Sequence, residues 1–383
     1  MDLHSTFPGV VDLKWRAQQR LPKFVWEYLD SGTGTEATKA RNRSALDQVG
    51  FMPSILHGPM ECDLSTRFLG RPLPRPFGIA PVGMSGLIWG DAEGHLARHA
   101  AQVKIPYALS TVARQNPEDL APYLGDHAWF QLYPPKSEEI RHDLLHRAKA
   151  AGFDTLVLTV DVPAASRRER QTRSGLTQPP RFTPRILAQI AARPAWALSQ
   201  AQERIRGGRG GLRMRTLAKY TRAMGNLPPT QHIGYLLRTS PDMDYVHWLR
   251  DHWDGPLIIK GVLRPEDAAP LKRAGVDALW ISNHAGRQFD AAPATIEVLP
   301  QIRAATDLPL IFDSGIEGGL DILRALALGA DFVMLGRAYH FALAALGPQG
   351  PAHLTEILSQ DMQANMGQLG VNTVQQVTQL VPW

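Results

Sequence analysis

The sequence predicts an α/β protein, a closed (β/α)8 (TIM) barrel formed as one domain by residues 1–383. Eight short apolar runs recur along the chain, and most are followed by a polar turn and a helical pattern. Strand and helix alternating eight times is typical of this barrel. With 44% hydrophobic and 20% charged residues, the chain can also bury the large core that the fold requires.

The apolar runs lack the polar alternation of a strand that faces solvent on one side. Near-continuous hydrophobicity indicates strands buried on both faces, as in a parallel sheet covered by helices. The predicted strands are Phe77–Ala80, Tyr107–Ser110, Ala128–Leu132, Thr155–Val160, Leu257–Lys260, Ala278–Ser282, Leu308–Asp313 and Phe332–Leu335. The predicted intervening helices are Glu93–Gln102, Ser137–Ala151, Asp242–His252, Pro265–Ala274, Thr295–Ala304, Gly319–Leu328 and Ala338–Leu346.

Two segments lie outside this alternation. Residues 1–70 precede the first strand and predict an N-terminal helical cap, in which Pro22 favours the start of one helix. Residues 162–240 separate the fourth strand from its helix and are rich in Arg, Gly and Pro. Because ordinary connections are about 2–6 residues long, this insertion indicates a lid, a membrane-docking segment or a partly disordered stretch.

The positive charge of the protein is concentrated in this insertion. Residues 167–222 carry thirteen Arg and one Lys against two Glu, although the net charge of the whole chain is only +5. One basic segment on an acidic body favours a docking surface or an anion-handling loop. The Arg/Gly stretch Arg204–Arg215 has few interleaved aromatic residues for stacking bases, so we expect no nucleic-acid partner.

Other classes of protein are excluded by what the sequence lacks. Cys62 is the only cysteine, which excludes a disulfide framework and a Cys-rich metal site. His95 and His99 have the spacing of two ligands but lack a third, so we expect no metal. With neither a signal peptide nor a membrane-spanning run, we expect a cytoplasmic protein, whose basic segment could dock at the inner face of the cytoplasmic membrane.

Polar and charged residues follow almost every predicted strand. The carboxyl ends of barrel strands form the rim at which such folds carry their chemistry. These residues are Pro81, Val82, Gly83, Ser110, Gln131, Tyr133, Thr159, Asp161, Lys260, Ser282, His284, Asp313, Ser314, Gly315, Gly336 and Arg337. Since Lys, His, Asp and Arg are costly to bury without partners, their convergence on one rim indicates a functional site.

The seventh and eighth strand ends indicate a phosphorylated ligand. Barrels often hold a phosphate on the loop amides and short helix found there. Lys260 would face an electron-rich part of the same molecule, and the hydroxyl and amide groups on the other strand ends would bond a polar heterocycle. This combination suits flavin mononucleotide, FMN.

Three further side chains suit the oxidation of a hydroxy acid beside that flavin. His284 can take the proton that such an oxidation releases. Asp161 can hold the other nitrogen of the imidazole and stabilise its protonated form. Arg287 has the forked geometry that grips a carboxylate through two hydrogen bonds.

The string Ser282-Asn283-His284-Ala285-Gly286-Arg287-Gln288 closely resembles the active-site signature of the FMN-dependent L-2-hydroxy acid oxidising family. This family includes L-lactate dehydrogenase, glycolate oxidase and mandelate dehydrogenase, and the pattern is closest to the L-lactate dehydrogenases. The resemblance extends over nearly the whole chain except the insertion and the extreme C-terminus. It includes Leu21-Pro22-Lys23, Ile79-Ala80-Pro81, Leu109-Ser110-Thr111, Trp129-Phe130-Gln131-Leu132-Tyr133, Leu158-Thr159-Val160-Asp161, Ile259-Lys260-Gly261 and Leu335-Gly336-Arg337.

The resemblance implies a role for each site residue. His284 would be the base, Asp161 its partner, and Tyr133 a hydroxyl that contacts the substrate oxygen. Tyr28, Arg168 and Arg287 would bind the substrate carboxylate, and Lys260 would stabilise reduced flavin. Pro81, Val82, Gly83, Ser110, Gln131, Thr159 and Ser282 would line the flavin ring, and Asp313, Ser314, Gly315, Gly336 and Arg337 the ribityl phosphate. Family members are often homotetramers, so the resemblance also implies a homo-oligomer.

Four positions bear on differences within this family. Glu317 stands where members commonly carry an Arg toward the phosphate, which predicts weaker FMN binding, and Ala285 replaces a frequent Gly. Gly83 resembles dehydrogenase members, which favours a quinone or cytochrome acceptor over oxygen. Val112 replaces a bulky Trp of glycolate oxidase-like members and leaves room for lactate, mandelate or a longer acid. An oxygen-using oxidase that produces hydrogen peroxide stays an alternative.

The insertion occupies the place of the segment that some dehydrogenase members use to reach the membrane. Its strings Arg185–Ala191 and Trp196-Ala197-Leu198 add apolar groups to basic ones, which suits an anionic lipid surface. The rival interpretations are a solvated lid and a catalytically inactive flavin barrel that serves as a membrane scaffold. An FMN isomerase on the same fold would not need the Asp161, His284 and Arg287 set.

Overall fold

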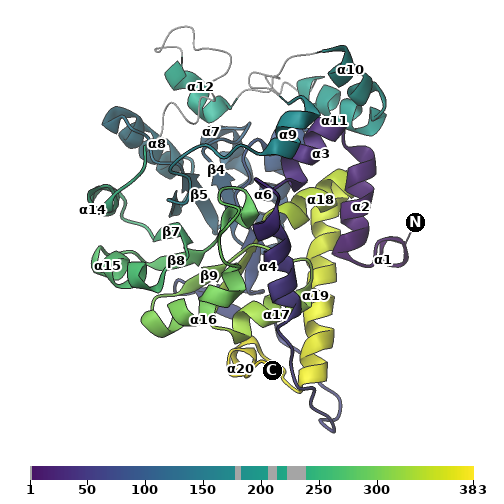
Figure 1. Cartoon of the computed structure of the whole chain (residues 1–383), viewed down its shortest axis with the longest axis vertical. Helices are drawn as coiled ribbons and strands as arrows, with labels where there is room; N and C mark the ends of the chain where they lie inside the picture. The colour runs from purple at the N-terminus through teal and green to yellow at the C-terminus, as the bar shows by residue number, and fades with distance from the viewer. Residues whose placement is uncertain (1, 177–182, 206–213, 222–238) are drawn as a thin grey trace.

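A closed barrel of eight parallel strands forms the centre of the protein (Figure 1). The computed structural model describes residues 2–176, 183–205, 214–221 and 239–383. The barrel strands are β3 (Phe77–Ile79), β4 (Tyr107–Ser110), β5 (Ala128–Leu132), β6 (Thr155–Thr159), β7 (Leu257–Val262), β8 (Ala278–Ile281), β9 (Leu310–Phe312) and β10 (Phe332–Leu335). The pairing of β10 with β3, in which Val333 lies opposite Phe77, closes the barrel. The predicted fold and all eight predicted strands are confirmed.

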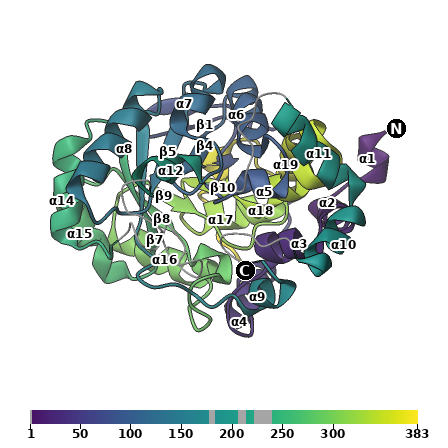
Figure 2. The same ribbon diagram turned by 90° about the horizontal axis from the view of Figure 1, so that it is seen from above.

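Helices surround the strands, as the view from above shows (Figure 2). They are α6 (Ala92–Val103), α7 (Pro117–Leu120), α8 (Glu138–Ala150), α14 (Met243–His252), α15 (Ala268–Arg273), α16 (Thr295–Ala305), α17 (Gly319–Ala327) and α18 (Arg337–Leu346). The seven predicted helices are confirmed, although the one at residues 265–274 begins as a 3-10 turn at Pro265–Asp267. Helix α7 was not predicted, because its four residues are too few to show a helical period.

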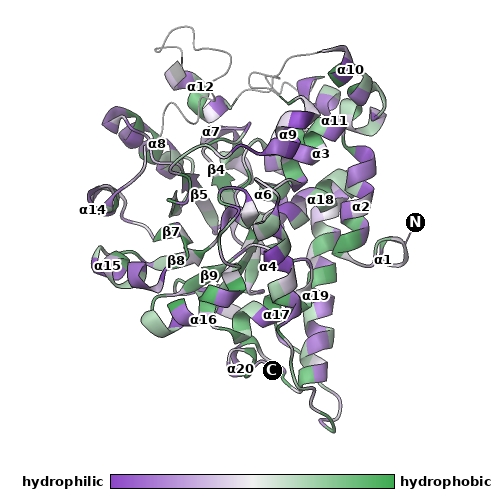
Figure 3. Cartoon of the chain, viewed as in Figure 1, coloured by the Kyte–Doolittle hydropathy of each residue, from purple (hydrophilic) through white to green (hydrophobic). Residues whose placement is uncertain are grey.

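The barrel interior is filled with large apolar side chains, and the barrel strands are mostly hydrophobic (Figure 3). Trp129, Trp280 and Phe332 pack there with the side chain of Phe68. Phe68 belongs to an antiparallel hairpin of β1 (Thr66–Phe68) and β2 (Arg71–Leu73), and its ring stacks on Phe332 at a centroid distance of 5.0 Å. Because Phe332 and Trp129 lie at the start of their strands, the hairpin closes the amino-terminal end of the barrel.

The N-terminal segment forms four helices, α1 (Leu3–Thr6), α2 (Val10–Arg20), α3 (Lys23–Asp30) and α4 (Ala37–Asp47). They lie beside the barrel, where α2 packs on α18 and α4 packs on α16. Residues 51–65 contain no helix, so the segment 1–70 is helical only in its first two thirds. The turn between α3 and α4 reaches the rim, since Gly286 accepts a hydrogen bond from the main chain of Thr33.

The C-terminal helices were not predicted from the sequence. Helix α19 (Gly350–Leu369) packs on α17 and α18 and buries eleven of its twenty residues. The short helix α20 (Val374–Val377) follows it, and α5 (Ser85–Ile88) lies between β3 and α6.

The described parts of the insertion form α9 (Glu169–Ser174), α10 (Pro184–Ala191), α11 (Pro194–Ile205) and α12 (Arg215–Thr221), all in the upper part of Figure 1, with α12 apart from the other three. Trp196 is buried, and its indole Nε1 donates to the carbonyl oxygen of Leu87 at 3.0 Å. This apolar residue therefore attaches α11 to the barrel and is not available to a membrane. The predictions for residues 177–182, 206–213 and 222–238 lie outside the described residues. Within the described residues, no helix is both long and apolar enough to span a bilayer.

Candidate active site

A cavity of about 570 Å³ opens at the carboxyl ends of the barrel strands. Sixteen of the predicted site residues line it, namely Tyr28, Pro81, Val82, Gly83, Gln131, Tyr133, Thr159, Arg168, Lys260, His284, Arg287, Asp313, Ser314, Gly315, Gly336 and Arg337. Three predicted residues do not line the cavity, but each forms a hydrogen bond with a residue that does. They are Ser110, Asp161 and Ser282. The structure thus brings the whole predicted set together at one rim.

A hydrogen-bonded chain supports the floor of the cavity. Ser110 Oγ donates to Gln131 Oε1 at 2.7 Å, and Gln131 Nε2 donates to Thr159 Oγ1 at 3.0 Å. All three side chains are buried. The bonds therefore fix the orientation of the Gln131 amide beside the cavity.

His284 and Asp161 form a partly buried pair. The imidazole Nδ1 lies 3.0 Å from Asp161 Oδ1 and 3.1 Å from Oδ2, which leaves Nε2 on the opposite side of the ring. Burial lowers the pKa of His284, although the Asp161 charge opposes this shift. Burial also acts to raise the pKa of Asp161, but His284 and then Lys260 outweigh it and hold that pKa below its ordinary value. The pair is therefore a neutral imidazole oriented by an ionised carboxylate.

The approach of Asp161 to His284 depends on a glycine in β7. Gly261 has a φ of +108°, and a Cβ built on it would lie 2.5 Å from Cβ of Asp161. The pairing of β7 with β8 also shifts register between Lys260 and Val262. A larger residue at this bulge would displace the carboxylate from the imidazole.

Two guanidinium groups face the same cavity as His284. Arg287 lies over the ring of Tyr28, with its Cζ 5.6 Å from the ring centroid, and its Nη1 donates to the carbonyl oxygen of Ser31 at 2.6 Å. Burial, with the nearby charge of Arg168, lowers the pKa of Arg287 to about 9. A partly buried cation that is repelled by a second cation stabilises an anion placed between or beside them.

Lys260 is held by neighbouring strand ends. Its Nζ lies 2.9 Å from Asp313 Oδ2, bonds Ser282 Oγ and lies 4.9 Å from the ring centroid of Trp280. Trp280 Nε1 donates to the same carboxylate oxygen at 3.0 Å. These contacts fix the ammonium group at the cavity wall.

At the end of the cavity near β9 and β10, Glu317 has an ion-pair partner, Lys14, that the sequence did not reveal. Glu317 lines the cavity, and its Oε1 accepts from Nζ of Lys14, on α2, at 2.9 Å. The negative charge predicted at Glu317 is therefore compensated by a residue some three hundred positions away. Arg337 begins α18 in the same region, and its Nη1 donates to the carbonyl oxygen of Asp30 at 3.3 Å.

Comparison with known proteins assigns the chain to a family. The family model described as "FMN-dependent dehydrogenase" matches residues 17–382. The chain belongs to this family. Among its relatives, the L-lactate dehydrogenase of Serratia proteamaculans is 38% identical over 380 residues, covering 96% of each chain. That of Pseudomonas aeruginosa strain LESB58 is 37% identical over 377 residues, again covering 96% of each chain.

Solved structures of related proteins share the fold of this FMN-dependent dehydrogenase. The structure of the monotopic membrane protein (S)-mandelate dehydrogenase has a TM-score of 0.89 and 33% identity, covering 97% of each chain. A lactate oxidase from Pediococcus acidilactici has a TM-score of 0.82 and 29% identity, covering 98% of this chain and 94% of the other.

The cavity fits the FMN on which this family depends. Its volume falls within the roughly 300–1,000 Å³ typical of ligand pockets. Cationic side chains outnumber carboxylates among the residues that line it, which suits a phosphorylated cofactor together with an organic acid. Gly315, Gly336 and Arg337 would hold the phosphate, and Lys260 and Gln131 the ring.

Three residues of the site environment escaped the sequence analysis. Lys14 and Met214 lie in segments whose paths cannot be derived from the alternation of strands and helices, yet Lys14 meets Glu317 and Met214 lines the cavity. Arg170 lies two residues beyond Arg168 and forms ion pairs with carboxylate side chains of the N-terminal segment. The clustering of arginines at residues 167–170 was visible in the sequence, but not the partners of each one.

Proposed function

We propose that this FMN-dependent dehydrogenase oxidises an L-2-hydroxy acid to the 2-oxo acid, with L-lactate to pyruvate as the first reaction to test. The observation that carries the proposal is the oriented imidazole of His284 in one cavity with Arg168 and Arg287. The names of the L-lactate dehydrogenase relatives support the same chemistry.

Each site residue would have a separate role in that reaction. Arg287 and Arg168 bind the substrate carboxylate, which places C2 next to Nε2 of His284. The hydroxyl of Tyr28, which donates to the carbonyl oxygen of Gly83 at 2.6 Å, redirects its hydrogen bond to that carboxylate. His284 accepts one proton from the carbinol group, from its oxygen in a hydride route or from C2 in a carbanion route, and Asp161 stabilises the imidazolium that results. Tyr133 bonds the substrate oxygen. Bound FMN supplies the two-electron acceptor, and Lys260 offers positive charge to its reduced ring.

The substrate end of the cavity favours an acid with an apolar side chain. Val112, Val162 and Met214 line the same cavity as Arg287 and present aliphatic groups to it. A side chain larger than the hydrogen of glycolate gains free energy by covering this surface, by about 0.8 kcal/mol for each buried methylene. Mandelate and longer 2-hydroxy acids are the alternative substrates, and the (S)-mandelate dehydrogenase neighbour supports including them.

We further propose that a quinone or cytochrome, rather than oxygen, reoxidises the flavin. The resemblance of Gly83 to dehydrogenase members of the family supports this. A Cβ added at position 83 would lie 2.7 Å from Cγ2 of Val112, so a larger residue there would require the cavity wall to move. An oxidase that releases hydrogen peroxide is the second candidate, and the lactate oxidase neighbour favours testing it.

One panel of reactions tests these assignments. L-lactate, glycolate, L-mandelate and 2-hydroxyhexanoate are each supplied with a quinone-like dye under nitrogen and with oxygen alone. We expect faster turnover of L-lactate and L-mandelate than of glycolate, and faster turnover with the dye than with oxygen. Turnover with oxygen that equals the dye rate would favour the oxidase, and turnover of none of the acids would contradict the proposed function.

We also propose peripheral docking of this chain at the inner face of the cytoplasmic membrane. Leu187 on α10 and Leu198 on α11 are 52% and 58% exposed, and Arg185 and Arg193 lie on or beside the same helices. Exposed apolar groups with basic neighbours suit an anionic lipid surface. The structural neighbour described as a monotopic membrane protein supports this arrangement.

Vesicle flotation tests the docking proposal. We expect the protein to float with vesicles that contain phosphatidylglycerol and to stay unbound with pure phosphatidylcholine. The double variant Leu187→Glu/Leu198→Glu should lose binding, whereas Ile55→Glu, which changes an exposed apolar residue between α4 and β1, should keep it.

The homotetramer implied by the family resemblance stays a prediction, which the mass of the protein in solution tests.

A further inference from the structure

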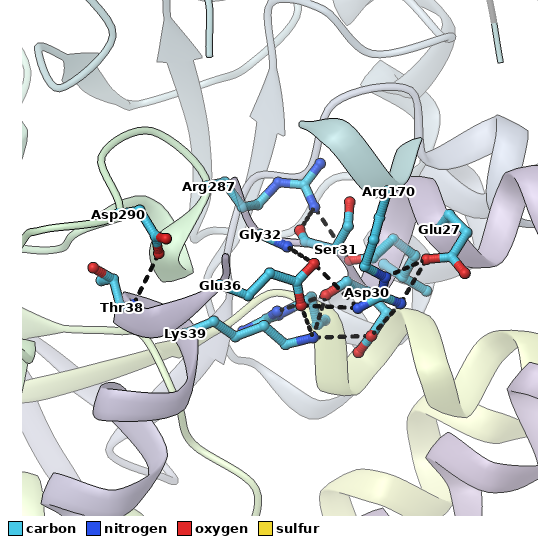
Figure 4. Close-up of polar contacts among 12 residues, drawn as sticks. Glu27, Asp30, Ser31, Gly32, Glu36, Thr38, Lys39, Arg170, Arg287 and Asp290 are labelled. Atoms are coloured by element: carbon cyan, nitrogen blue, oxygen red, sulfur yellow. Dashed lines mark hydrogen bonds and ion pairs between the residues drawn. The ribbon is translucent and has the colours of Figure 1, made fainter. Parts of the chain in front are cut away.

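The first helix of the insertion is attached to the N-terminal segment by one arginine (Figure 4). Arg170, on α9, donates from Nε to Glu27 Oε2 at 2.6 Å, from Nη1 to Glu36 Oε2 at 2.8 Å and from Nη2 to Asp30 Oδ2 at 3.1 Å. The three carboxylates come from α3 and from the turn that leads into α4. All of them are partly or largely buried, so these ion pairs are screened less than pairs on an open surface.

Two neighbours of Arg170 add contacts to the same turn. Glu169 Oε2 accepts from the main-chain N–H of Gly34 at 2.9 Å, and the main-chain N–H of Arg168 lies 3.5 Å from Thr33 Oγ1. Arg168 itself has a φ of +46°, a left-handed conformation that is unfavourable for a residue with a side chain. This conformation persists only where the surroundings hold it, and the contacts of residues 168–170 provide that support.

The same turn also holds the second substrate-facing arginine. Arg287 donates to the carbonyl oxygen of Ser31, next to Asp30, and Lys39 binds the Asp30 carboxylate at 2.9 Å (Figure 4). On the far side, Asp290 accepts from the main-chain N–H of Thr38 at 3.0 Å, which ties the loop after β8 to α4. Residues 30–38 are therefore the common support of the loop that carries Arg287 and the helix that follows Arg168.

Arg168 and Arg287 repel each other until an anion enters. Arg168 and Arg287 line the same cavity, and the charge of Arg168 contributes to the lowered pKa of Arg287. Without an attachment, the segment carrying Arg168 would lower its electrostatic energy by moving away from Arg287. The three carboxylates around Arg170 counter that tendency, because they hold α9 against the support of Arg287.

We propose that Arg170 is a positioning residue for substrate binding: by attaching α9 to Glu27, Asp30 and Glu36 it keeps Arg168 beside Arg287, so that both arginines grip the carboxylate of one hydroxy acid. The inference rests on the proposed function, in which these two arginines bind the substrate. Arg170 itself is not among the residues that line the cavity.

The test compares Arg170→Ala and Arg170→Lys with the matched control Arg173→Ala. Arg173 lies on the same helix with an exposed side chain. Lysine keeps the positive charge among the three carboxylates but lacks the fork that reaches all of them, so it serves if the alanine variant folds poorly. Three quantities are measured on the FMN-loaded enzyme: KM and kcat for the best hydroxy acid, the Kd of FMN, and the Kd of 2-hydroxy-2-methylpropanoate. This last acid lacks a hydrogen on C2, so it binds without reacting and is detected by its effect on the flavin spectrum.

We expect Arg170→Ala to raise KM and the Kd of 2-hydroxy-2-methylpropanoate by about tenfold, the equivalent of one lost ion-pair contact with the substrate. Arg170→Lys should raise both several-fold, while the Kd of FMN and kcat should stay within about twofold of the wild type. Arg173→Ala should change none of these quantities. Unchanged KM and unchanged acid Kd in both Arg170 variants, or a loss of FMN binding as large as the loss of acid binding, would overturn the proposal.

A double-mutant cycle separates positioning from general stability. If Arg170 acts through Arg168, then Arg170→Ala should have little further effect on acid binding once Arg168 has been changed to Ala. Additive effects of the two substitutions would contradict this mechanism. A wild-type enzyme that oxidises no hydroxy acid would instead refute the proposed function, an outcome distinct from an active wild type whose Arg170 variants bind the acid normally.

Discussion

At the scale of single residues, the candidate site depends on a neutral imidazole that is oriented by a partly buried carboxylate. His284 lies in the left-handed region at φ +55°, and Asp161 approaches it only because position 261 is a glycine. The sequence indicated both side chains, since the carboxyl ends of parallel strands must meet at one rim. It could not indicate the compensation of Glu317 by Lys14, because nothing in the local pattern around either residue records their contact.

The pH dependence of kcat/KM should report the titration of His284. Because the base must be neutral and burial lowers its pKa, activity should persist below the ordinary histidine pKa of about 6.5 and fall only at more acidic pH. Asp161→Asn removes a charge that raises the pKa of His284, so its acid limb should move to still lower pH, with kcat reduced about a hundredfold. An acid limb that moves to higher pH in this variant would contradict the assigned pair.

The Lys14 and Glu317 pair should tune cofactor affinity in opposite directions. Glu317→Gln removes a negative charge beside the predicted phosphate position and should tighten FMN binding about two- to fivefold. Lys14→Met removes the nearby cation and should weaken binding by a similar factor, the size expected for partly exposed charges. Quenching of FMN fluorescence during titration of apoprotein measures both. Equal shifts in the same direction would show that the pair does not act on the phosphate.

Val112 should control the size of the substrate. Because it lines the cavity within reach of position 83, Val112→Trp should fill the space beside the substrate side chain. We expect kcat/KM for L-mandelate to fall at least tenfold and that for glycolate to change about twofold or less. Steady-state kinetics with both acids measures the ratio, and a parallel loss for both would show that Val112 does not select by size.

At the scale of elements, strands and barrel helices were predictable because each has a hydrophobic period of its own. Segments whose structure depends on packing against distant parts of the chain were not predictable in this way. The β1–β2 hairpin has only three residues in each strand. It closes the amino-terminal end of the barrel by packing on aromatic residues of distant strands. Helix α19 has apolar residues on more than one side because it packs between several helices, and this obscured its period.

Removal of the Phe68 side chain should destabilise the barrel without changing the rate of the catalysed reaction. Phe68 is 4% exposed and packs on Trp129 and Phe332 at the end of the barrel opposite the active site. Phe68→Ala should therefore lower the free energy of unfolding by about 3–5 kcal/mol, while kcat at low temperature stays close to that of the wild type. Urea unfolding followed by tryptophan fluorescence measures the first quantity. A variant of normal stability would contradict the packing role.

At the scale of the whole molecule, the site is assembled from segments that are far apart in sequence. Tyr28 comes from the N-terminal helices, Asp161, His284 and Arg287 from loops that follow barrel strands, and Arg168 from the insertion. Barrel topology alone predicted the strand-end residues. Tyr28 and Arg168 were identified only by resemblance to the family, because neither lies at a strand end and the fold alone does not bring their segments to the rim.

The most direct test of the account is the anaerobic reduction of bound flavin, followed by stopped-flow absorbance in the wild type and in His284→Gln. The account predicts that L-lactate or L-mandelate bleaches the flavin of the wild type. His284→Gln should bind FMN normally and lose at least a hundredfold in the rate of bleaching, because it lacks the group that accepts the proton. Equal rates in the two proteins, or a wild-type flavin that no L-2-hydroxy acid reduces, would contradict it.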